Sequence, residues 1–247
     1  MKGFFVAGTD TGVGKTEIAR AICASLARKG LRPLALKPVE TGCEPDRPED
    51  ALALREECGS AQSLDEVCPY RFRLPAAPLV AAEAEGAQID LLRIEQLVAR
   101  ASTPIVVEAA GGLLVPLARE PLSLDQMDPA DRAPALAIVT NLDLAERLRL
   151  PVVLVGRAGL GTLNHCALNV DALEQRGLLL AAVVLNRTSA EDDPTVATNA
   201  RWVSEMTGAN VLGPGPFVSD RAARLEALAR LVAPLFGWER SAASVLR

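Results

Sequence analysis

The chain has 247 residues, of which 49% are hydrophobic and 3% are aromatic, so Ala, Leu and Val must fill most of a large core. A formal net charge of -5 with scattered charges, and no long basic stripe, argues against a general nucleic-acid-binding protein. No signal-peptide pattern and no uncharged stretch of about twenty residues is found, so we expect a cytoplasmic protein without a membrane partner. The five cysteines are widely spaced, which disfavours a zinc site or a disulfide framework.

Short apolar runs alternate with longer segments of helical periodicity along the chain. The runs predict strands at residues 3–7, 33–37, 104–107, 152–155, 182–185 and 210–212. The longer segments predict helices at residues 15–29, 49–57, 90–101, 141–149, 163–176, 194–207 and 221–235. This alternation predicts an α/β fold in which helices flank both faces of a mostly parallel β-sheet.

No internal repeat or low-complexity linker divides the chain, so we expect a single domain over residues 1–247. Two proline-containing regions interrupt the alternating pattern. Residues 68–86 are expected to form a loop region at the rim of the sheet, and residues 119–135 an exposed insertion. The end of the chain, residues 238–247, is expected to fray.

The segment GTDTGVGKT, residues 8–16, lies between the first predicted strand and the first predicted helix. A strand, a glycine-rich turn, Gly-Lys-Thr and a helix form the phosphate-binding loop of P-loop nucleotide hydrolases. There Lys15 would reach the outer phosphates and the Thr16 hydroxyl would hold a magnesium ion. The first glycine of the motif is Gly8, one position earlier than usual, and Thr9 takes its place. The alternative is an ordinary glycine turn followed by a surface lysine.

Charged residues follow other predicted strands, at the edge where ligands bind in sheets of this type. Lys37 ends the second strand and suits an anionic intermediate or a transferring phosphoryl group, although, taken alone, this position favours a solvated lysine paired with a carboxylate. Glu108 ends the third strand, where a buried carboxylate needs a magnesium ion or a basic side chain as its partner. Asp50 begins a helix and either caps it or provides a second magnesium ligand.

Two more turns have the composition of ligand-binding loops. The segment GRAGLGTLNH, residues 156–165, opens a helix, and its amides would suit an anion such as a substrate carboxylate. Asn186 ends the fifth strand and is either a turn residue or a reader of a purine base through paired hydrogen bonds. The segment GPGP, residues 213–216, is a rigid loop that would flank such a base.

Taken together, these motifs resemble the dethiobiotin synthetase family in order and spacing from about residue 2 to residue 216. The resemblance rests on GTDTGVGKT (8–16), KPVETG (37–42), DAL (50–52), PY (69–70), EAAGG (108–112), GLGTLNH (159–165) and Asn186. It implies a homodimer with its active site near the interface, MgATP as co-substrate, and conversion of 7,8-diaminononanoate and CO2 to dethiobiotin, ADP and phosphate. The reaction would pass through a carbamate and a carbamic-phosphoric anhydride.

The resemblance also implies roles for individual residues. It assigns Lys15, Lys37 and Thr41 to catalysis and Thr16, Asp50 and Glu108 to magnesium. It assigns the diamine to Thr11, Lys37 and Thr41 of one subunit and to Leu160, Gly161 and Asn164 of the other. It assigns ATP to Thr11, Gly12, Val13, Gly14, Lys15, Thr16, Glu108, Gly111, Asn186, Pro214, Gly215 and Pro216.

The chain departs from the family at Ala109, where glycine is common, and at Thr41, where serine is common. The main alternative function is that of a partitioning or positioning ATPase acting through protein partners. Such proteins usually carry a further lysine early in the phosphate loop, and residues 8–11 contain none. An amide-forming enzyme with a glutaminase domain, or the regulatory module of an acyltransferase, is expected to be longer.

Overall fold

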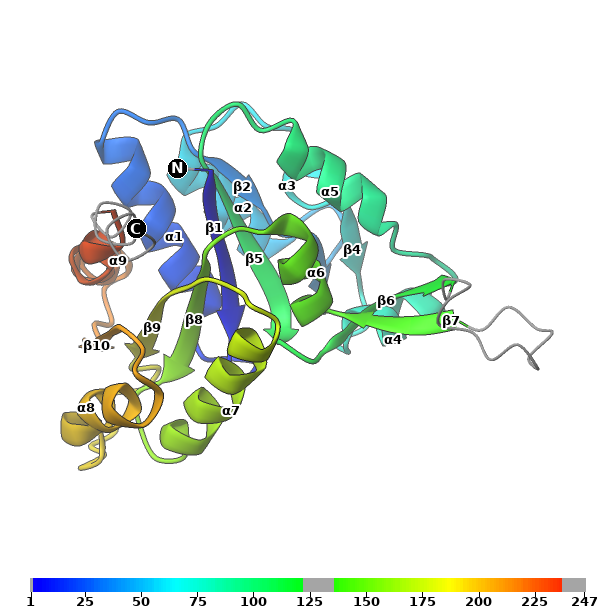
Figure 1. Cartoon of the computed structure of the whole chain (residues 1–247). Helices are drawn as coiled ribbons and strands as arrows, with labels where there is room; N and C mark the ends of the chain where they lie inside the picture. The colour runs from blue at the N-terminus through cyan, green and yellow to red at the C-terminus, as the bar shows by residue number, and fades with distance from the viewer. Residues whose placement is uncertain (1, 122–135, 237–247) are drawn as a thin grey trace, which may run out of the picture.

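The computed structural model describes residues 2–121 and 136–236, in which a six-stranded parallel sheet forms the centre of the molecule (Figure 1). The strand order is β10-β9-β8-β1-β5-β2, and each neighbouring pair is parallel. All the predicted strands lie in this sheet, so the predicted α/β class is confirmed. The strands are β1 (Gly3–Gly8), β2 (Leu34–Leu36), β5 (Ile105–Gly112), β8 (Val152–Arg157), β9 (Leu180–Asn186) and β10 (Val211–Gly215).

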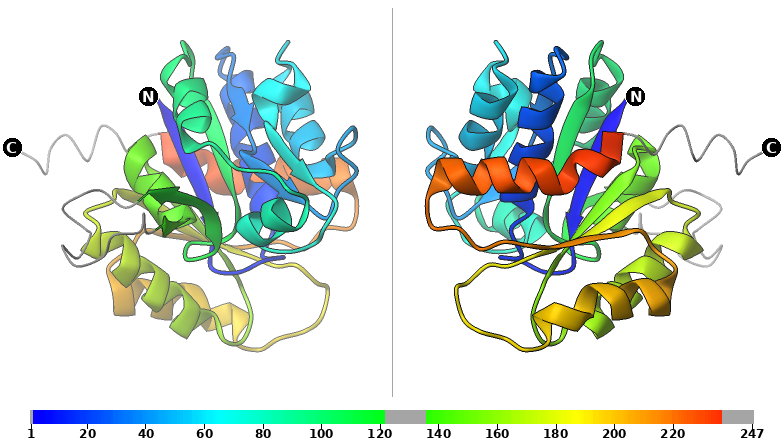
Figure 2. Two further views of the ribbon diagram at one scale, coloured as in Figure 1. Left: turned by 90° about the vertical axis from the view of Figure 1, so that its right-hand side faces the viewer. Right: turned by 90° about the vertical axis from the view of Figure 1, so that its left-hand side faces the viewer.

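Helices cover both faces of the sheet, as Figure 2 shows. Successive side chains of β1 point to opposite faces, so Phe4 and Val6 pack in one core cluster while Phe5 and Ala7 pack in the other. The first cluster lies under α1 (Lys15–Arg28), α2 (Glu49–Cys58) and α9 (Arg221–Val232). The second lies under α5 (Leu91–Ala99), α6 (Asn141–Leu148), α7 (Thr162–Gln175) and α8 (Val196–Thr207). These helices confirm the predicted ones.

The prediction of a loop over residues 68–86 was wrong. This region contains β4 (Tyr70–Phe72), which pairs with β3 (Val39–Thr41), and helix α4 (Pro78–Ala84). The short helix α3 (Leu64–Val67) precedes it. Elements of three to seven residues are too short to produce a periodic apolar pattern, and a proline in the first turn, as in α4, begins a helix as readily as it ends one.

An antiparallel hairpin projects from the sheet where an exposed insertion was expected. In it β6 (Pro116–Pro121) pairs with β7 (Leu136–Thr140), so residues 119–121 belong to a strand (Figure 1). The rest of the expected insertion and the expected frayed end lie outside the described residues, and the single-domain division stays a prediction. Within the described part of the chain, none of the helices combines the length and the apolar character needed to cross a membrane.

Gly3 provides a test of the pairing between β1 and β5. Its φ is +134°, and a Cβ atom there would lie 1.8 Å from the carbonyl oxygen of its register partner Ile105. We expect Gly3→Ala to lower the free energy of unfolding by about 3 kcal/mol or more in urea titrations, because the strands must separate to admit the methyl group. The control is Gly30→Ala, where φ is +77° and the added atom meets open space, and its cost should be about 1 kcal/mol. An equal decrease in the free energy of unfolding in the two variants would contradict the close pairing of β1 and β5 at Gly3.

Candidate active site

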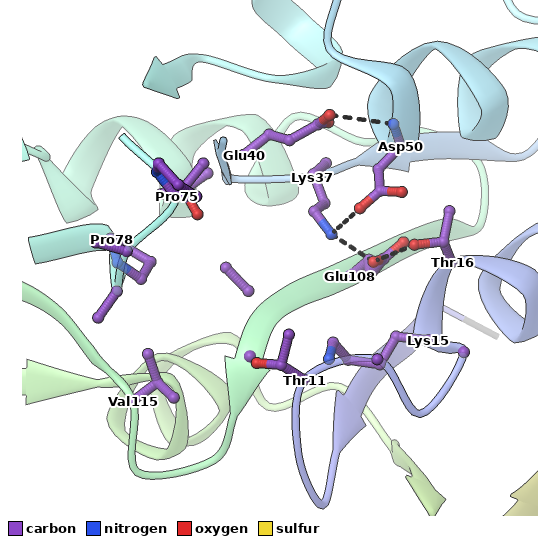
Figure 3. Close-up of a pocket in the computed structure, with 18 residues that line it drawn as sticks. Thr11, Lys15, Thr16, Lys37, Glu40, Asp50, Pro75, Pro78, Glu108 and Val115 are labelled. Atoms are coloured by element: carbon purple, nitrogen blue, oxygen red, sulfur yellow. Dashed lines mark hydrogen bonds and ion pairs between the residues drawn. The ribbon is translucent and has the colours of Figure 1, made fainter. Parts of the chain in front are cut away.

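A cavity of about 660 Å³ opens where β1, β2 and β5 end (Figure 3). Its walls come from the loop between β1 and α1, from β3, from the start of α2, from the end of β5 and from the turn before α4. The volume and the position at the carboxyl ends of parallel strands are those of a small-molecule site. The cavity brings together ten of the residues singled out in the sequence: Thr11, Gly12, Gly14, Lys15, Thr16, Lys37, Thr41, Asp50, Glu108 and Gly111.

The phosphate loop ends in the first turn of α1. Its N-cap residue is Gly14, which has no side chain to cap the helix, so the first amides of α1 are available to an anion. Lys15 is buried and its Nζ donates to the carbonyl oxygen of Asp10, 3.0 Å away. Burial, together with the positive charge of Lys37, lowers the pKa of Lys15. An anion in the loop would relieve both effects.

A buried ion-pair cluster lies beside the end of the phosphate loop, next to Thr16 (Figure 3). Lys37 Nζ pairs with Glu108 Oε1 and donates to Asp50 Oδ2 at 3.0 Å, while Thr16 Oγ1 donates to Glu108 Oε1 at 2.9 Å. Burial by itself would lower the pKa of Lys37, but the charges of Glu108 and Asp50 outweigh it and raise this pKa above its ordinary value. The neighbouring carboxylates therefore favour the charged form of Lys37, which lines the cavity.

The cluster fits a magnesium ion. Glu108 is fully buried, and its Oε2 has no hydrogen-bond partner among the described residues, which is costly for a carboxylate oxygen unless a cation approaches it. Asp50 and Thr16 add two oxygen donors of the kind that magnesium prefers. Nowhere in residues 2–121 and 136–236 do three or more His, Cys, Asp or Glu side chains gather as a metal site. The remaining ligands would therefore come from water and from phosphate oxygens.

Asn186 lies behind the phosphate loop and does not line the cavity. Its Nδ2 donates to the carbonyl oxygen of Val13 at 3.1 Å, and its Oδ1 is buried without a partner in the described chain. Gly14 has a φ of +91°, which favours glycine, and a Cβ atom there would lie 2.1 Å from Asn186 Nδ2. Gly215 is the register partner of Asn186, so the loop containing Pro214 and Pro216 adjoins it. The structure thus brings these predicted ATP residues together, and their contact with adenine stays a prediction.

The glycine-rich turn before α7 also lies outside the cavity lining. Leu160, Gly161 and Asn164 are exposed, and Leu160 has 78% of its surface accessible. The carboxylate of Asp193 accepts a hydrogen bond from the Leu160 amide at 2.7 Å. The side chain of Asn199, on α8, donates hydrogen bonds to the carbonyl oxygens of Ala158 and Gly159 and so stabilises the turn. No local pattern pointed to Asp193 or Asn199, because both lie more than thirty residues from the turn.

Several cavity residues were missed by the sequence analysis. They form a mostly apolar wall opposite the phosphate loop, and they are Val39, Glu40, Pro75, Ala76, Ala77, Pro78, Ala110 and Val115. Of these, only Glu40 carried a signal, as an acidic residue within KPVETG. Ala109 does not line the cavity, since its methyl group is buried in the core cluster under α5 and α6. The departure from glycine at this position therefore changes the core rather than the cavity wall.

Comparisons with known proteins agree with this arrangement. A family model described as an AAA domain matches residues 2–136 and 133–223. The chain is 45% identical over 237 residues to the ATP-dependent dethiobiotin synthetase of Anaeromyxobacter dehalogenans (strain 2CP-C). The aligned region covers 94% of this chain and 98% of that relative. The identity is 33% to the enzyme of that name from Thermodesulfovibrio yellowstonii, with 88% and 90% of the two chains covered. It is 32% to the one from Bacillus cereus (strain B4264), with 92% and 88% covered. Since these identities extend over nearly the whole chain, the protein belongs to the ATP-dependent dethiobiotin synthetase family.

Proposed function

We propose that the protein uses ATP and CO2 to close the ureido ring of 7,8-diaminononanoate, giving dethiobiotin, ADP and phosphate. The observation that carries this proposal is the buried cation Lys37, which lines the same cavity as Lys15 of the phosphate loop. Lys15 in the loop suffices to hold a nucleotide phosphate. A second cation, kept charged by Glu108 and Asp50, suits a second anionic reactant.

The chemistry would run in three steps. One amine adds to CO2, forming the C–N bond of a carbamate and releasing a proton. A carbamate oxygen then attacks the γ-phosphorus of ATP, the bond to ADP breaks, and a carbamic-phosphoric anhydride forms. Finally the second amine attacks the carbonyl carbon, a further proton is released, and phosphate leaves as the ring closes. Each intermediate is short-lived in water, so holding the reactants together in one cavity is the main contribution of the protein.

The side chains of the cavity divide this work. Lys15 and Lys37 would lower the energy of the charge that develops on the carbamate and the transferring phosphoryl group. Thr41 would donate to the carbamate or the diamine, and Thr11 would contact the diamine from the phosphate loop. A magnesium ion held by Thr16, Asp50 and Glu108 would neutralise phosphate charge when bound. The adenine would lie against Asn186, Pro214, Gly215 and Pro216.

The carboxylate end of the diamine would be bound by a second copy of the chain. Leu160, Gly161 and Asn164 are exposed and none of them lines the cavity of its own chain, which favours a site completed across a homodimer interface. A closed two-fold dimer would form two such sites.

Phosphate release from MgATP tests the reaction. We expect release to require both 7,8-diaminononanoate and bicarbonate and to be accompanied by an equal amount of dethiobiotin. Lys37→Gln, which retains a donor for Glu108, should lower turnover by about 100-fold or more because a cation is lost at the reacting group. The control is Lys29→Gln, at the far end of α1, which should retain full activity. Hydrolysis indifferent to the diamine would instead favour a regulatory ATPase with protein partners.

Co-expression of two defective variants tests the shared site. Lys37→Gln disables the cavity, and Asn164→Asp places a negative charge where the substrate carboxylate would bind, so each variant should be nearly inactive alone. In a random mixture, half of the dimers contain one copy of each variant. In such a dimer, the unchanged cavity of one chain meets the unchanged turn of the other, so one of its two sites is intact. Activity should therefore recover to about a quarter of that of the wild type. A site formed within one chain predicts no recovery.

A further inference from the structure

We propose that Glu40 is a positioning residue that caps α2 from a distance and thereby holds Asp50 in place for the magnesium ion. This inference rests on the proposed function for the role of Asp50, and the cap itself is a feature of the fold. Figure 3 shows Glu40 reaching from its strand to the backbone of Asp50, on the side away from Lys37.

The side-chain hydrogen bonds of Glu40 in the described structure are made to the start of α2. Its Oε1 accepts from the amide of Asp50 at 3.1 Å, and its Oε2 accepts from the amide of Ala51 at 2.9 Å. The residue at the N-cap position of α2 is Pro48, whose side chain makes no capping bond. A cap normally comes from the residue directly before the helix, whereas here it comes from strand β3. The negative charge of Glu40 also interacts favourably with the positive end of the helix.

Glu40 therefore fixes the backbone of the residue whose side chain enters the charged cluster. The Asp50 carboxylate accepts from Lys37 at 3.0 Å, so Asp50 is held at its amide by Glu40 and at its side chain by Lys37. Without the first bond, the opening turn of α2 would fray, as helix ends do when their amides lack partners. The Asp50 carboxylate would then be displaced from Glu108 and Thr16.

Two other roles for Glu40 are disfavoured by the same contacts. A magnesium ion is favoured most by a carboxylate oxygen that lacks a partner, and each oxygen of Glu40 already accepts an amide hydrogen bond. A general base must be directed at the substrate, whereas the carboxylate of Glu40 is directed at the helix amides. Glu40 is only 6% exposed although it lines the cavity, which agrees with a carboxylate turned toward the helix. Glu108, in contrast, retains an oxygen without a partner in the described chain.

The cap also joins two parts of the site. Thr41, proposed to contact the diamine, follows Glu40 in β3, and Asp50 lies at the start of α2. A single side chain thus connects the strand that would contact the substrate to the helix that would hold the metal. The loop between them, residues 42–48, is exposed at Gly42, Glu44, Asp46 and Arg47.

The test compares Glu40→Ala and Glu40→Gln with the wild type, by amide hydrogen exchange and by kinetics. In the nucleotide-free protein, we expect Glu40→Ala to speed exchange of the Asp50 and Ala51 amides by about tenfold or more, because their acceptors are removed. The KM for magnesium should rise by about tenfold, as for other residues that orient a metal ligand. The kcat at saturating magnesium should stay within about threefold, since no group touching the reacting atoms is lost. Glu40→Gln retains one acceptor oxygen and should give intermediate values.

Glu44→Ala is the matched control. It removes a carboxylate from the loop after β3, where Glu44 makes an exposed ion pair with Arg73, and it should change neither measurement. Unchanged exchange in Glu40→Ala would overturn the cap. Faster exchange with an unchanged KM for magnesium would overturn the positioning of Asp50. A loss of kcat in both Glu40 variants with normal magnesium binding would assign Glu40 to the chemistry instead. Amide exchange is measured without substrates, so it tests the hydrogen bonds between Glu40 and α2 even if the protein does not catalyse the proposed reaction.

Discussion

The buried ion pair between Lys37 and Glu108 is the interaction on which the arrangement of the site depends. Both charges lie inside the protein, where each is stable only if the other is present and hydrogen-bonded. Lys37 directly follows β2 and Glu108 lies in β5, so parallel pairing of these two strands sets the positions from which the pair forms. The phosphate loop and α2 then add Thr16 and Asp50 around it. Stability and function thus draw on the same contacts.

The loops that carry the other site residues are fixed by buried polar side chains from distant parts of the chain. Asn141 donates from the start of α6 to the carbonyl oxygens of Ala110 and Gly112, at 2.7 and 2.9 Å. Asn199 holds the turn before α7 in the same way, and Glu40 holds the start of α2. In each case a segment that would touch a ligand is supported by a residue that does not react. Such support keeps a site close to its productive geometry before the ligand binds.

The fit between the phosphate loop and β9 shows how closely the site and the sheet are packed. Gly14 lies against the side chain of Asn186, which itself donates to the loop at Val13. A change at either residue would be transmitted to the amides that face the phosphates. The family assignment and the geometry agree here, because Gly14 and Asn186 both belong to the residues that carry the resemblance and the fold brings them into contact.

The sequence by itself determined the features that depend on local patterns. Apolar runs and helical periodicity predicted the strands of the main sheet and the helices on its faces, and the spacing of Gly14, Lys15 and Thr16 predicted the phosphate loop. Because the strands are parallel, the convergence of Lys37 and Glu108 at one edge could also be predicted. Other features became visible only in the tertiary structure. They are the short strands β3 and β4, the hairpin, the apolar wall of the cavity, and the hydrogen bonds of Glu40, Asn141, Asp193 and Asn199. These features depend on residues up to several tens of positions apart, whose hydrogen bonds and packing exist only after the chain has folded and leave no periodic signal in the sequence.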